Sequence, residues 1–311
     1  MAVLFTVLSL LMTCVEDLFE KKSVTSKTEE VLKTLVWYGI FNIIILCIVL
    51  CFGLDETSRL PHELIMQTPG VVLPAVLSCT TLLFALAAYK YVGVSVRNTF
   101  ANVDGLFYIV ILVIFHLVTG KASFAARLFS PSVIIGTVLI ISSTLIYPHI
   151  KPLHDENEEI HKEKTGVSLP VLGIILALTA ALFDGTESVV SSYLIGDDVV
   201  DSMDYIAVTT LIQGTIIFFI WIVLSVKEKK IYNPFLKSEK NRFLSQLFCI
   251  IGDLLYVFAL SDDALISVIL WNVFPVLDIL GARIFMKEKL NFRQYAVLFT
   301  LIIGALFVSL A

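Results

Sequence analysis

Five carboxylic acids interrupt long apolar segments of this sequence, and they are the residues best placed to do chemistry. An acid at the centre of a membrane-spanning helix costs about 2.5–3.5 kcal/mol on insertion scales, so it is a functional candidate by default. Such a group can take up a proton on one side of a membrane and release it on the other, which suits proton-coupled antiport. The candidates are Glu16, Asp184, Glu187, Asp253 and Asp278.

A structural role for these acids is the alternative. Each carboxylate can pair with Arg97, with Arg283 or with a backbone group, and then only fix how helices pack. The sequence alone leaves both roles open.

A second polar group lies in the apolar segment 94–118. Asn98 and Asn102 are four residues apart and share a helix face, and Arg97 and Asp104, seven apart, share another. Arg97 can hold a substrate carboxylate or phosphate in a bidentate fork. Because it is close to the start of the segment, it can equally extend to the membrane surface.

Aromatic and amide side chains accompany the acids. Tyr256 follows Asp253 by three residues, and Trp271 and Asn272 precede a proline by about one turn. A proline frees a backbone carbonyl, which is tolerated where it faces protein or water, so these side chains are candidates to line a cavity. Ordinary packing is the alternative. Trp37 and Tyr38 are expected in an interfacial aromatic belt.

The composition shows what must position these side chains. The chain has 311 residues, of which 58% are hydrophobic and 16% charged, and its mean hydropathy is +0.91. An average soluble domain is roughly 45–50% apolar and about 25% charged, so a single soluble domain is excluded. A net charge of −5 provides no basic field for nucleic acid.

Apolar segments of roughly 17–25 residues are long enough to cross a bilayer as helices. The sequence predicts an all-α integral membrane protein with ten transmembrane helices, and short turns at 90–93 and 261–263 predict tight hairpins. The expected spans are 2–19, 31–53, 71–89, 94–118, 131–149, 169–195, 203–226, 243–260, 264–286 and 293–310.

The basic residues are distributed unequally between the two sets of alternating loops. One set carries 19 lysines and arginines, and the other carries only Arg59, Lys121 and Arg127. The positive-inside rule places the basic set in the cytoplasm, so both termini are predicted outside. We expect a multi-pass protein of the cytoplasmic membrane, with the lipid bilayer as its surroundings.

A charged segment at 150–168 separates five predicted spans from five others. The predicted domains are a first five-helix repeat (1–149), a cytoplasmic linker (150–168) and a second repeat (169–311). An offset of 168 residues aligns the start of the two halves and places Glu16 opposite Asp184. Because five is odd, the halves have opposite orientation, and such inverted repeats are typical of transporters that bind substrate near the midplane.

The remaining motifs indicate neither cofactor nor metal. The five cysteines lie in apolar segments without a Cys-x-x-Cys pair, and no metalloprotease, hydrolase or phosphate-loop pattern occurs. The linker histidines are typical of a solvated loop. We therefore expect no cofactor, no metal site and no enzyme.

The segment 264–310 resembles the EamA-type members of the drug/metabolite transporter superfamily. Pro275 in an apolar helix, Glu288 in a charged turn, Gln294 and Gly304 in a last helix stand where that family has them. The resemblance implies ten helices in two five-helix halves and a transport function. Members of that family carry cargoes that range from amino acids and other metabolites to nucleotide sugars and lipids.

Together these features predict a secondary active transporter, an exporter or exchanger, that moves a small organic metabolite by alternating access as a monomer or homodimer. One alternative is a lipid or isoprenoid-phosphate flippase of the same fold. Another is a membrane scaffold that transports nothing, in which the intramembrane acids are neutralised pairwise.

Overall fold

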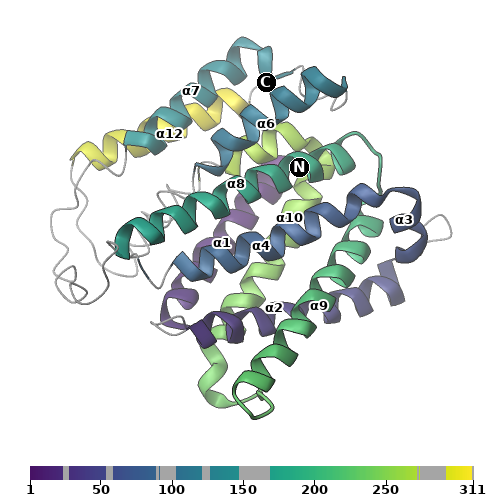
Figure 1. The fold of residues 1–311 in the computed structure, drawn as a ribbon. Coiled ribbons are helices and arrows are strands. Elements are labelled where there is room, and N and C mark those ends of the chain that lie inside the picture. The colour runs from purple at the N-terminus through teal and green to yellow at the C-terminus, as the bar shows by residue number, and fades with distance from the viewer. Residues whose placement is uncertain are drawn as a thin grey trace.

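The computed structural model describes residues 1–23, 28–53, 59–88, 91, 103–120, 127–146, 169–271, 273 and 292–309 (Figure 1). Within these residues every regular element is a helix. The long helices are α1 (Ala2–Ser23), α2 (Thr28–Ile48), α4 (Val72–Ala88), α6 (Asp104–Thr119), α7 (Pro131–Ile146), α8 (Leu169–Gly196), α9 (Ser202–Lys227), α10 (Lys240–Trp271) and α12 (Phe292–Ser309). The short elements are η1 (Val49–Gly53), α3 (Pro61–Gln67), η2 (Pro69–Val71) and η6 (Lys237–Glu239).

The predicted spans coincide with these helices where the structure describes them. In the described part of the chain, five helical segments are long and apolar enough to cross a membrane, and three apolar helices are shorter. The long segments are 30–53, 69–88, 171–196, 202–227 and 237–271, and the shorter ones are 104–119, 131–143 and 295–308. The chain is thus an all-α membrane protein. The helix α3, which begins with Pro61 in its first turn, is an addition to the prediction.

A backbone break divides α10 into two segments at the predicted turn 261–263. Asp263 has φ −158° and ψ 97°, which is not helical. The Ser267 hydroxyl donates to the carbonyl of Ala259 over 2.9 Å. Eight residues of straight helix span about 12 Å, so this bond requires the chain to reverse direction. The tight hairpin predicted here is confirmed, whereas the one predicted at 90–93 lies, apart from Tyr91, outside the described residues.

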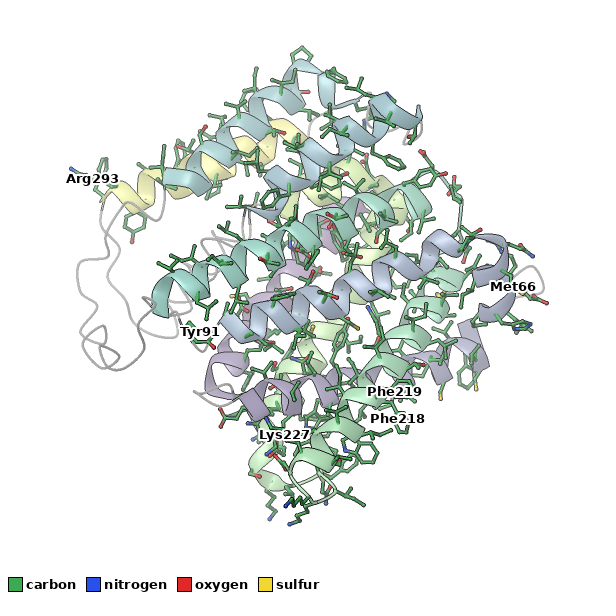
Figure 2. The ribbon with its side chains drawn as sticks, viewed as in Figure 1. Met66, Tyr91, Phe218, Phe219, Lys227 and Arg293 are labelled. Carbon is green, nitrogen blue, oxygen red and sulfur yellow. The ribbon has the colours of Figure 1, made fainter. Side chains whose placement is uncertain are left out.

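The outer surface of the bundle is apolar over the middle of its helices. Phe218 and Phe219 on α9 are 50% and 61% exposed, and Figure 2 shows both on the outside of that helix, with Lys227 at its end. Ile114 on α6 and Phe299 on α12 are also more than half exposed. Contiguous apolar surface of this kind fits lipid rather than water.

Five helix pairings among the described residues hold the bundle together. The helix α1 packs on both segments of α10, and α8 packs on α4 and α6. The helix α2 packs on α9, and α7 lies beside α12 at one edge (Figure 1). Every one of these pairings joins an element of residues 1–149 to an element of residues 169–311, so the contact between the halves forms the core.

Candidate functional site

Asp253 lies on the first segment of α10, facing α2. Its Oδ2 atom accepts a hydrogen bond from the Tyr38 hydroxyl over 3.0 Å and lies 4.0 Å from the Cys249 sulfur. Tyr38 is 2% exposed, whereas Asp253 is partly exposed, so this bond is part-buried. The expectation of an interfacial position for Trp37 and Tyr38 is wrong, because both side chains are buried between helices.

Glu187 lies on α8 within a group of hydroxyls. The Ser191 hydroxyl, one turn further along, donates to Glu187 Oε1 over 2.7 Å, and the Tyr205 hydroxyl of α9 lies 3.5 Å from the same oxygen. The two hydroxyl oxygens are 2.7 Å apart. Hydroxyl donors therefore hold this carboxylate from two helices.

The acids of three helices lie close enough to interact electrostatically. Glu16 on α1 interacts with Asp253 and with the Cys249 thiol. Asp184 on α8 interacts with both Asp253 and Glu187. The structure thus brings together four acids that are up to 237 positions apart in the sequence, and we call Glu16, Asp184, Glu187 and Asp253 the acidic site.

An aromatic pair adjoins the acidic site. The rings of Tyr256 and Trp271 have centroids 4.8 Å apart at 53°, which the reversal of α10 makes possible. Tyr256 lies close enough to Glu187 of α8 to interact with it electrostatically. Trp271 also packs on Leu10 of α1, so the pair connects α10 with α1 and α8.

Asp104 is placed differently from the other predicted residues. It begins α6, and its Oδ1 accepts from the Gly105 amide over 2.8 Å, as expected of an acid in a first turn. Its carbonyl oxygen lies against Gly185 of α8, where a Cβ would be 2.7 Å away. The backbone of Asp104, rather than its side chain, therefore adjoins the acidic site. Five further candidates lie outside the described residues: Arg97, Asn98, Asn102, Asn272 and Asp278.

Several polar residues that the sequence analysis did not select also adjoin the site. Glu20 on α1 is 1% exposed and accepts a hydrogen bond from Gln246 Nε2 over 3.1 Å. Gln246, Cys249, Asp253 and Tyr256 are spaced by three, four and three residues, which places them on one face of α10. This spacing was the signal available in the sequence.

One end of the bundle has ion pairs between the halves. Arg59 Nε lies 3.3 Å from Asp204, which is 2% exposed and also accepts from the Arg59 amide. Arg127 contacts Asp263 over 2.7 Å, and the amino terminus lies 2.9 Å from Asp262. Two of the three basic residues in the poorly basic loops thus have acidic partners at this end.

The opposite end is also joined across the halves. Lys33 on α2 lies 2.7 Å from Glu228. Arg242 pairs with Glu239 and donates to the carbonyl of Ser23 over 3.0 Å. The loop residue Tyr232 donates to Glu239 over 2.8 Å, and burial together with this hydrogen bond raises the pKa of its hydroxyl.

Among the described residues, no group of three histidine, cysteine or acidic side chains is arranged to hold a metal ion. An open, apolar hollow of about 370 Å³ is lined by the end of α9 and the residues after it, including Trp221, Ser225 and Lys229. None of its lining residues belongs to the acidic site.

The fold and the acidic site define a polytopic helical membrane protein with ionisable groups between its two halves. Residues 171–310 match the model of the EamA-like transporter family. The resemblance predicted from 264–310 is confirmed. The match implies a membrane transporter of small molecules.

A solved structure supports the same fold over the whole chain. A crystal structure of a protein aligns with 99% of this chain and 96% of its own, with a TM-score of 0.66 at 14% sequence identity. At this identity the likeness shows the fold alone. A search of curated proteins finds no match.

Proposed function

We propose that this protein is a secondary active transporter that moves a small organic metabolite across the cytoplasmic membrane by alternating access. Transport is coupled to protons through the acidic site, and the carrier acts as an exporter or exchanger. Both termini lie outside. The observation that carries the proposal is the Tyr38–Asp253 bond, which joins the halves beside Glu16 and Asp184.

Helix pairing supports two inverted repeats, 1–149 and 169–311, joined by the linker 150–168. The helix α1 packs on both segments of α10, as α8 packs on α4 and α6, and α2–α9 and α7–α12 pair across the halves. If each helix is replaced by its counterpart 168 positions away, so that α1 exchanges with α8 and α4 with the first segment of α10, the same set of pairings results. A transporter with such symmetry changes from inward-open to outward-open by exchanging the conformations of its halves.

The chemistry of the acidic site supports proton coupling. Glu187 and Asp253 are held by hydroxyl groups, which donate to a charged carboxylate and accept from a neutral one. Hydroxyl partners therefore tolerate both protonation states, whereas an arginine would favour only the charged state. Rocking of the halves would move these acids between the two aqueous sides.

Substrate-driven proton flux tests the proposal. Proteoliposomes that trap a pH-sensitive dye would be exposed in turn to amino acids, amines and nucleotide sugars. At least one class should change the internal pH, and Asp253→Asn should abolish the change, whereas Asp262→Asn, at the end of the bundle, should preserve it. Responses equal to those of protein-free liposomes throughout, or full flux with Asp253→Asn, would overturn the proposal.

A further inference from the structure

We propose that the transported solute is an organic cation, an amine with an apolar or aromatic body, that binds between the acidic site and the Tyr256–Trp271 pair. This inference rests on the proposed transport function and names its substrate class. It starts from the charge of the site, the hydrogen-bonding capacity left open in it, and the aromatic surface beside it.

The charge of the site is the first observation. In the part of the chain that the structure describes, no lysine or arginine pairs with Glu16, Glu187 or Asp253. Their partners are the hydroxyls of Tyr38, Ser191 and Tyr205 and the Cys249 thiol. Because Glu16 is buried and Glu187 and Asp253 are only partly exposed, a positively charged ligand would stabilise their charged forms by supplying a counter-charge.

An open acceptor beside the acids is the second, independent observation. Gln246 is 0% exposed, and its Nε2 atom donates to the Glu20 carboxylate. Its Oε1 atom, on the amide that this bond holds beside Glu20, has no hydrogen-bond partner among the described residues. A buried acceptor without a donor is unfavourable, so the site favours a ligand that brings donors. An ammonium group has three donors and no acceptor.

The polar face of α10 gives the path for such a ligand. Gln246, Cys249, Asp253 and Tyr256 follow one another along this face over about 15 Å of helix. Glu16 and Glu20 of α1 lie opposite its first part, and Trp271 lies against its last. A cation that moves along this face therefore meets hydrogen-bond acceptors from Glu20, near the end of α1, as far as the Tyr256–Trp271 pair.

The aromatic pair completes the recognition surface. Ring faces of tyrosine and tryptophan attract cations and also pack well on apolar groups. Both rings are partly exposed, and Tyr256 lies within the field of Glu187. An anionic solute such as a phosphate ester would be repelled by the acids, so this site disfavours a phosphate-bearing cargo.

Three probes of similar shape and different charge test the inference on the full chain in detergent. These are phenethylamine as the cation, 2-phenylethanol as the neutral analogue and 3-phenylpropionate as the anion. Because a ligand that binds the folded state raises the melting temperature, we expect stabilisation by phenethylamine alone. Equal stabilisation by all three, or by the anion alone, would overturn the cation site.

Variants locate the binding. Asp253→Asn and Glu16→Gln should weaken phenethylamine binding at least tenfold, and Gln246→Leu and Trp271→Leu should weaken it several-fold. Asp262→Asn removes an acid at the end of the bundle and should leave the affinity unchanged. The ligand-free melting temperature of each variant identifies those that do not fold. Wild-type affinity in folded Asp253→Asn and Glu16→Gln would overturn the inference.

Failure of the transport proposal is distinguishable from failure of this one. Binding of phenethylamine that depends on Asp253, without proton flux in proteoliposomes, rejects proton coupling and supports the cation site. Proton flux driven by a neutral or anionic solute, with no binding of phenethylamine, supports the transporter and rejects the cation site.

Discussion

Gly136 of α7 and Gly304 of α12 face each other across the contact between the two halves. A Cβ on Gly136 would lie 2.6 Å from the carbonyl oxygen of Gly304, and a Cβ on Gly304 would lie 2.9 Å from that of Gly136. The contact is therefore reciprocal. The two glycines are 168 positions apart, the same offset that places Glu16 opposite Asp184.

This contact predicts that Gly136→Ala and Gly304→Ala destabilise the protein. Backbone atoms are less able than side-chain ends to move away, so each added methyl should cost about 1–3 kcal/mol, as overpacking does. Gly70→Ala is the control, because nothing lies within 4 Å of its added Cβ. Melting temperatures in detergent measure the difference. Equal melting temperatures for all three variants would contradict the close contact.

The Tyr38–Asp253 bond predicts a functional effect without unfolding. Tyr38→Phe removes the hydroxyl and keeps the ring, so it should cost roughly 1 kcal/mol of stability while slowing proton flux several-fold. Tyr232→Phe is the matched control, because Tyr232 also donates its hydroxyl to a carboxylate, that of Glu239, but does so after α9 and away from the acidic site. That variant should lose similar stability and keep its flux. The same flux in both variants would argue against a special role for Tyr38.

The ion pair between Arg59 and Asp204 predicts a stability effect larger than that of a surface pair. Arg59→Gln leaves the nearly buried Asp204 carboxylate without its charged partner and should cost about 1–3 kcal/mol. Lys33→Gln breaks the more exposed pair with Glu228 and should cost at most about 1 kcal/mol. Thermal unfolding of the two variants gives the comparison, and a greater loss in Lys33→Gln would refute the assignment.

The orientation of the chain predicts which residues react from outside. In a variant without the native cysteines, Ser261→Cys at the reversal of α10 should react with a membrane-impermeant maleimide on intact cells. Lys230→Cys, after α9, should react only after the cells are permeabilised. Both positions are exposed. The reverse labelling pattern would show that the basic loops face outward.

The helices and the acids within them were predictable from the amino-acid sequence. Length, hydropathy and the charges between apolar segments predict helical spans, because a bilayer requires about 20 apolar residues and internally satisfied backbone groups. The break at Asp263 was also predictable, since Ser261, Asp262 and Asp263 form a short polar interruption between two long apolar segments.

Which side chains meet was not predictable from the sequence, because the contacts depend on how the helices pack. The partnership of Tyr38 with Asp253 spans 215 positions and that of Glu20 with Gln246 spans 226, and no local pattern encodes such separations. Hydropathy is nearly uniform along α2 and α9, so it does not reveal which face turns inward. That choice depends on close packing, in which Gly39 of α2 admits Ile217 of α9, and the resulting rotation of α2 turns Tyr38 from the expected interface to the acidic site.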